Sequence, residues 1–236
     1  MIYNLFSRIF ARKADREFLE SLVSKDITDI IGGVCEDSDT AESLKENARD
    51  IVSDKDKLSE AQSDFERLFI IPLNDKFIPP YIGYYLGNTS KTSGGSNADI
   101  DVKGGDVTRA EKLEIMFKSL NFTPKDESWV TSKRADHIAY ILGFMAALIS
   151  FEEKHPAEQV KERPPLSEIV SEEFYFFNEF IGNWINLFAE EVIQRGGSPF
   201  YVQAAMLMKS FIRCEQRDFN SLPIHSLGNK RCTVNL

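Results

Sequence analysis

Apolar side chains recur at intervals of three and four residues over most of the chain, which is the spacing of amphipathic helices. The first such stretch, residues 1–31, predicts one helix that ends before two consecutive glycines. No segment alternates apolar and polar residues as a half-buried strand does, so the pattern predicts an all-α protein. The further predicted helices cover residues 35–66, 107–120, 136–151, 167–195 and 199–217.

Prolines and small polar residues mark the connections between these helices. Pro72 and Pro79-Pro80 remove backbone donors within an aromatic stretch, which predicts an ordered loop. Residues 87–106 are rich in Gly, Ser, Asn and Asp, a composition typical of a flexible connection. The length of 236 residues suits a single compact domain with a substantial core.

The overall charge narrows the classes of partner. The formal net charge is -9, and no basic stretch offers the phosphate contacts that a nucleic-acid-binding surface needs. A basic partner suits an acidic chain better, and we expect no nucleic acid.

The cysteines and the apolar runs indicate a cytoplasmic protein. Cys35, Cys214 and Cys232 have neither the spacing of a zinc site nor an even number for a disulfide framework. No run reaches the ~18 apolar residues that cross a bilayer, so we expect no integral membrane segment. Charges interrupt the apolar residues of the first segment, and a secretory signal is not expected there.

Motifs for catalysis are missing, and we predict no enzyme and no cofactor. The sequence lacks GxSxG, HExxH and a phosphate-binding loop. A calcium-like stretch begins at Asp99, but Lys103 occupies a ligand position and Ala110 stands where the loop needs Glu. The histidines, too few for metal ligation, are His137, His155 and His225.

Asp136-His137, at the start of the predicted apolar helix 136–151, is the most distinctive polar pair. Neighbouring residues on a helix point about 100° apart, so the two side chains do not form a catalytic dyad. From these residues alone, Asp136 caps the helix or favours its positive end, and His137 packs beside it.

Several stretches, taken together in their order, resemble the TorD/DmsD family of redox-enzyme maturation chaperones. The resemblance extends from about residue 60 to residue 215. The residues that carry it are Glu60, Asp64-Phe65, Leu68-Phe69, Pro79-Pro80-Tyr81, Tyr85, Arg134 to Ile138, Phe180 to Trp184, Phe188, and Ser198 to Tyr201.

The resemblance implies a fold and a function. It implies two packed helical halves, about 1–122 and 136–222, joined by a hinge at 123–135 and followed by a tail at 223–236. It implies a non-catalytic cytoplasmic chaperone that binds the twin-arginine signal peptide of a molybdenum-cofactor oxidoreductase. The expected partner is the apo-form of that molybdopterin enzyme subunit, and helix exchange makes a domain-swapped homodimer an open alternative.

The resemblance also assigns roles to side chains. A basic and apolar peptide needs carboxylates beside an apolar groove. The expected peptide-binding residues are Pro80, Tyr81, Tyr85, Asp136, His137 and Trp184, with plain core packing as the alternative for the aromatic ones. The residues expected to be structural are Glu60, Asp64, Phe65, Leu68 and Phe69.

Two other functions stay open from the sequence, a nucleotide-binding switch and a helical scaffold without a peptide ligand. The missing phosphate loop counts against the switch. If His137 lines the groove, its protonation near pH 6.5 predicts weaker binding of a basic peptide below that pH.

Overall fold

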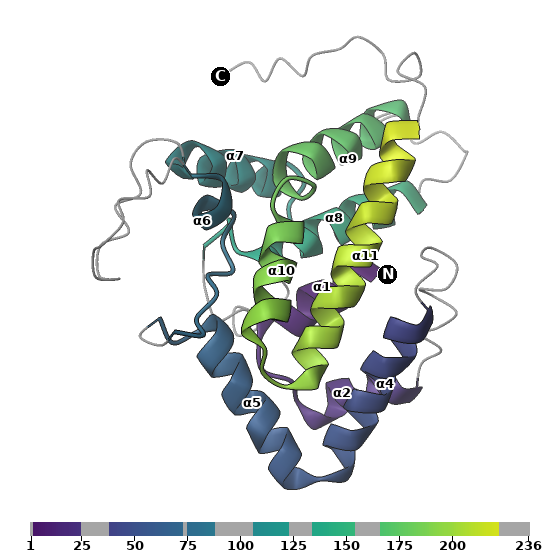
Figure 1. Cartoon of the computed structure of the whole chain (residues 1–236). Helices are drawn as coiled ribbons and strands as arrows, with labels where there is room; N and C mark the ends of the chain where they lie inside the picture. The colour runs from purple at the N-terminus through teal and green to yellow at the C-terminus, as the bar shows by residue number, and fades with distance from the viewer. Residues whose placement is uncertain are drawn as a thin grey trace.

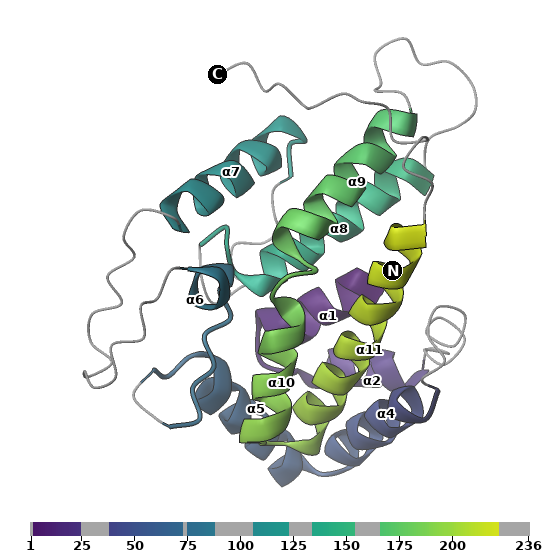
Figure 2. The same cartoon turned by 45° about the horizontal axis from the view of Figure 1, so that its top comes forward.

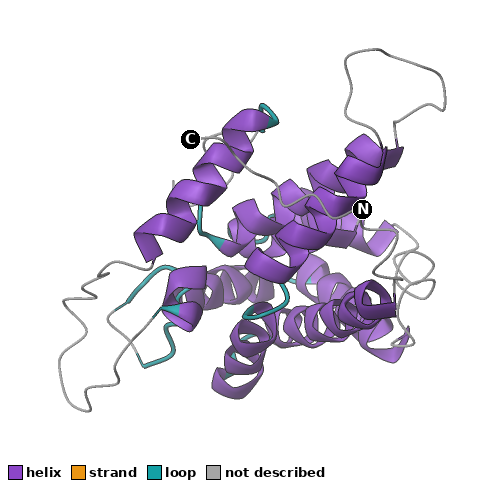
Figure 3. Cartoon of the chain, turned by 90° about the horizontal axis from the view of Figure 1, so that it is seen from above, coloured by secondary structure: helices purple, strands orange, loops and turns teal. Residues whose placement is uncertain are grey.

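The computed structural model describes residues 2–24, 38–72, 75–87, 106–122, 134–153 and 166–221. Within these ranges the chain is helical and contains no strand, so the all-α prediction is confirmed (Figure 3). The helices are α1 (Ile2–Ala11), α2 (Arg16–Ser24), α4 (Ser38–Ser53), α5 (Lys55–Phe69), α6 (Ile82–Leu86), α7 (Asp106–Ser119), α8 (Ile138–Glu153), α9 (Leu166–Phe180), α10 (Ile185–Arg195) and α11 (Pro199–Ser221).

The helices form pairs around a central α1. Helices α10 and α11 pack side by side, α8 packs on α9, and α4 contacts both α2 and α11 (Figure 1). Helix α1 lies between α8 and α11, while α6 and α7 lie together at one side of the molecule (Figure 2). The chain's first helix therefore contacts helices from its second half.

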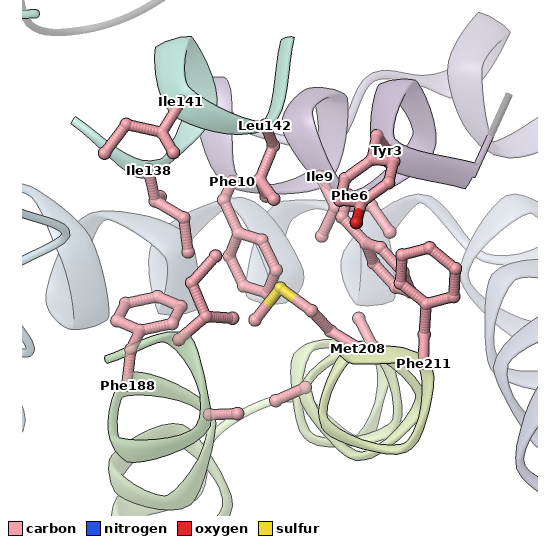
Figure 4. Packing of buried hydrophobic residues seen from close by; sticks show 14 of the residues in the cluster. Tyr3, Phe6, Ile9, Phe10, Ile138, Ile141, Leu142, Phe188, Met208 and Phe211 are labelled. Atoms are coloured by element: carbon pink, nitrogen blue, oxygen red, sulfur yellow. The ribbon is translucent and has the colours of Figure 1, made fainter. Parts of the chain in front are cut away.

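The core is a hydrophobic cluster to which α1 contributes Tyr3, Phe6, Ile9 and Phe10 (Figure 4). Phe6 and Phe10 are almost completely buried. The Phe10 ring meets Phe188 of α10 edge-on, with 5.2 Å between ring centroids, and Phe69 of α5 at 5.7 Å. Three helices distant in sequence thus meet at one side chain, and such edge-to-face contacts add to the hydrophobic term.

Two hydrogen bonds, one buried and one partly buried, attach α1 to its neighbours. The Ser7 hydroxyl donates to the carbonyl of Ala139 on α8 at 2.6 Å. The Tyr3 hydroxyl donates to Glu215 Oε2 on α11 at 2.9 Å. Burial, followed by the charge of Glu215, raises the pKa of Tyr3, so this donor keeps its proton.

The predicted helix over residues 1–31 is wrong as a single element. It breaks after α1, because Asp15 begins a new helix by accepting a hydrogen bond from the backbone N–H of Phe18 at 2.8 Å. Because the apolar spacing continues across the break, the periodicity alone does not show where α1 ends.

The predicted helix over residues 167–195 is also wrong as a single element. A turn at residues 181–184 separates α9 from α10, with the Gly182 N–H donating to Phe177 O at 2.8 Å. Gln216 on α11 donates to Gly182 O at 2.7 Å. A β-carbon at Gly182 would come within 3.1 Å of Gln216 and 3.2 Å of the Phe177 ring, so the close approach favours glycine.

Some predictions fall outside the described residues. These are most of the 87–106 connection and of the 123–135 hinge, the 223–236 tail, His155, His225, Cys35 and Cys232. The division into two halves stays a prediction. No helix in the described part of the chain is both long and apolar enough to cross a membrane.

Replacing Phe10 by alanine tests the central position of α1. We expect the free energy of unfolding to fall by about 3–5 kcal/mol, because a large side chain with little room for collapse leaves a cavity. Ile115→Ala is the control, since Ile115 is 47% exposed and should cost under about 0.5 kcal/mol. Denaturant titrations followed by circular dichroism measure both, and equal losses would contradict the assignment.

Candidate functional site

Two segments of the resemblance, far apart in sequence, are joined by backbone hydrogen bonds. The Ile138 N–H donates to Pro80 O at 2.8 Å, and the Ile82 N–H donates to Asp136 O at 3.1 Å. These bonds form an isolated antiparallel bridge between Tyr81 and His137. Helices α6 and α8 both begin at this bridge, which brings together Pro80, Tyr81, Asp136 and His137.

His137 is part of the start of α8. Its Nδ1 accepts a hydrogen bond from the Ala139 N–H at 3.1 Å, so this nitrogen is the unprotonated one. The ring is 2% exposed and meets the Tyr81 ring edge-on at 5.4 Å. The expectation that Asp136 caps the helix is therefore wrong, because His137 supplies the acceptor.

Burial keeps the His137 imidazole neutral. Desolvation, together with the nearby charge of Arg134, lowers its pKa to about 3. The protonation step expected near pH 6.5 is displaced far below that value. His137 therefore gives no reason for peptide binding to weaken between pH 7 and pH 5.

The Asp136 carboxylate is buried and paired within the chain. Arg134 Nε donates to Oδ1 at 2.9 Å and Nη2 donates to Oδ2 at 2.7 Å, the two-pronged geometry that guanidinium and carboxylate groups favour. Asp136 is 2% exposed, whereas the Arg134 side chain is 52% exposed. The Arg134 guanidinium also lies 4.5 Å from the centroid of the Tyr81 ring.

A second aromatic group lies directly after Tyr81. The Tyr85 ring packs against Trp184 at 5.4 Å and Tyr84 at 5.0 Å. Trp184 is fully buried, and its indole N–H donates to Phe180 O at 2.7 Å, so it supports Tyr85 from the core. Burial, then the charge of Glu191, raises the pKa of Tyr85.

Sequence reasoning missed two residues of this surface. The resemblance gives Arg134 no role, although its spacing two residues before an acid is a usable signal. Tyr84 is 38% exposed beside Tyr85 and presents an aromatic ring at the surface. The resemblance assigns peptide binding to its neighbour Tyr85, because the sequence does not show which tyrosine of a short helix faces outward.

The residues predicted to be structural lie on α5. Phe65, Leu68 and Phe69 are buried, while Glu60 is exposed. Asp64 is 5% exposed and pairs with Arg67.

The aromatic residues of α5 reach the start of α11. Phe65 packs 5.8 Å from Tyr201 and Phe69 packs 5.9 Å from it. A β-carbon at Gly197 would lie 3.0 Å from Leu68 Cδ1, so a larger residue there would require Leu68 to shift. These contacts put the α5 motif in the core, apart from the Tyr81–His137 bridge.

An open cavity of about 480 Å³ lies between α10 and α11. It contains none of the residues predicted to bind peptide. Its lining consists of Ile193, Met206, Lys209, Ser210, Arg213, Cys214 and Arg217. Lys209 donates toward Glu190 at 2.9 Å, which joins the two helices at its edge.

The described part of the chain holds no candidate metal centre. No group of three or more His, Cys, Asp or Glu side chains there is arranged to hold a metal ion. The arrangement at the bridge offers a paired carboxylate, a neutral imidazole and aromatic faces, which suit binding of a peptide or a cation.

Comparison with known proteins identifies the class. The family model described as nitrate reductase delta subunit matches residues 35–190, about two thirds of the chain, and the chain belongs to this family. It is 26% identical over 226 residues to the chaperone protein TorD of Vibrio parahaemolyticus serotype O3:K6 (strain RIMD 2210633), covering 91% of each chain. The resemblance to TorD-like chaperones is thereby confirmed, and no solved structure matches.

Replacing His137 by asparagine tests its neutral state. In the wild type, the unfolded chain binds a proton below about pH 6.5 while the folded chain does not, so stability falls as pH decreases toward 3. Asparagine retains an acceptor for the Ala139 N–H but does not titrate. From pH 7 to pH 5 the wild type should lose about 2 kcal/mol more than the variant.

The measurement is a series of urea titrations of both proteins at matched ionic strength. The difference between the two free energies of unfolding removes the contribution of all other titrating groups. A difference that stays constant with pH would show that His137 protonates normally in the folded chain.

Proposed function

We propose that this protein is a cytoplasmic chaperone that binds the twin-arginine signal peptide of a molybdenum-cofactor oxidoreductase and supports its maturation before export. The similarity to a chaperone over 91% of both chains supports a chaperone role for the whole chain. Family membership supports a redox enzyme as the client. The role requires binding without catalysis.

The observation that carries the proposal is the hydrogen-bonded bridge between Tyr81 and His137. It unites two segments of the family resemblance at one place, although 56 positions separate these residues (137 minus 81). Segments joined in this way share a surface whose geometry is fixed by backbone bonds rather than by mobile side chains. Such a preorganised surface lowers the entropic cost of binding.

The chemistry of the surface suits the proposed ligand. Tyr81 and Tyr84 present aromatic faces, which bind both apolar side chains and cations. The net charge of -9 attracts a peptide with a basic start. Trp184 and Tyr85 lie behind these rings and hold α6 in place.

Calorimetric titration with a synthetic twin-arginine signal peptide tests the proposal. The wild type should bind, and a Tyr81→Ala, Tyr84→Ala double variant should bind at least about tenfold more weakly, because tyrosines often dominate such contacts. Affinity should fall as salt concentration rises, since part of the attraction is ionic. Met206→Ala removes a 39% exposed apolar side chain on α11 and serves as the control.

Two results would count against the proposal. Absence of binding to a panel of twin-arginine peptides from the same genome would refute peptide recognition. Equal affinity of wild type and the double tyrosine variant would refute the surface while leaving the ligand in place.

A further inference from the structure

Asp136 and Tyr81 together contact the guanidinium group of Arg134. Its edge is held by both carboxylate oxygens of Asp136, at 2.9 Å and 2.7 Å. Its face lies 4.5 Å from the Tyr81 ring centroid. A guanidinium group is planar, offers two parallel N–H donors to the carboxylate and stacks on the aromatic ring. An ammonium group lacks the planar shape and the parallel donors.

The two sides of this ion pair differ in their freedom to move. Asp136 is 2% exposed, and its carbonyl accepts the Ile82 N–H within the bridge, so the carboxylate is held in the fold. The Arg134 side chain is 52% exposed and is therefore the outer member of the pair. Rotation of the Arg134 side chain toward solvent would uncover the carboxylate without breaking the backbone bridge.

An uncovered carboxylate at this position is costly, which determines how the site can be used. A buried charge that loses its partner is strongly destabilising, so the site favours an exchange of one guanidinium for another. In such an exchange the carboxylate keeps two charge-assisted hydrogen bonds and the ring keeps its cation.

We propose that Asp136 and Tyr81 form a guanidinium-binding subsite that Arg134 occupies in the free chain, and that an arginine of the bound peptide displaces Arg134. The identity of the ligand rests on the proposed function. The subsite itself rests on the geometry of the three residues. Arg134 thereby acts as a built-in competitor that selects arginine over lysine, and it multiplies the apparent association constant by the fraction of time the subsite is open.

The first experiment probes the subsite without any peptide. Arg134→Ala should be destabilised, and methylguanidinium at low millimolar concentration should raise its Tm in a saturable way, because a ligand that binds only the folded state stabilises it. Methylammonium should not do so. Wild type should not respond to either ion, because Arg134 occupies the subsite. Arg16→Ala is the control and should not respond either, since Arg16 is 51% exposed and its partner Glu20 is also exposed, so no buried carboxylate is uncovered.

The second experiment uses the unaltered chain, so it holds even if Arg134→Ala does not fold. In a ¹⁵N spectrum, the Arg134 Nε–H that donates to Asp136 should give a protected signal in the free protein. Saturation with the twin-arginine peptide should remove the protection. A signal that stays protected in the saturated complex would overturn the displacement.

The third experiment compares peptides. Arg134→Ala should bind the arginine peptide about tenfold more tightly than wild type does, as expected when a competitor closes a site for about nine tenths of the time. A matched peptide with two lysines should gain less than the arginine peptide. The salt dependence for the arginine peptide should also be steeper in the variant, because the ligand then adds an ion pair instead of replacing one.

The outcomes separate this inference from the proposed function. Rescue by methylguanidinium with no peptide binding in any variant would support the subsite and refute the proposed ligand. Peptide binding by wild type, with neither rescue nor tighter binding in Arg134→Ala, would overturn the subsite and leave the proposed function standing.

Discussion

The surface around Tyr81 depends on two backbone hydrogen bonds, those that pair residues 80–82 with residues 136–138. Proline at position 80 donates no hydrogen bond, but its carbonyl accepts the Ile138 N–H and so fixes the first turn of α8. The same pairing determines where α6 begins and buries His137 against Tyr81. The isolated bridge between Tyr81 and His137 positions the side chains of both segments. Helix packing alone would not fix which residue of one loop lies opposite which residue of the other.

The pairing also explains the unusual charge state of this region. The acid and the histidine that stand out in the sequence are both removed from solvent, one paired with Arg134 and the other neutral. Neither adds a free charge to the surface of the resting chain. Attraction for a basic ligand then arises from the net charge of the whole protein, while the local geometry supplies selectivity.

Sequence reasoning succeeded where the determinants are local. The all-α class follows from the three- and four-residue spacing of the apolar side chains, which each helix carries in its own sequence. It failed where a residue distant in sequence determines a helix boundary. The break between α9 and α10 is stabilised by Gln216 on α11, which no local pattern contains.

The candidate site shows the same division. Motif order located Tyr81, Asp136 and His137, but it did not show that Arg134 covers the acid, because an ion pair depends on the path of the backbone. Likewise, spacing did not distinguish the buried Trp184 from the exposed Tyr84.

The interior position of α1 has a consequence for biosynthesis. Its apolar face packs on α8 and α11, which the ribosome makes much later, and Tyr3 finds its partner at Glu215 after 212 further residues. Contacts of such long range slow folding and leave α1 without its partners until α11 has been synthesised. During this interval the nascent chain exposes the aromatic stripe of α1, which favours aggregation until α8 and α11 cover it.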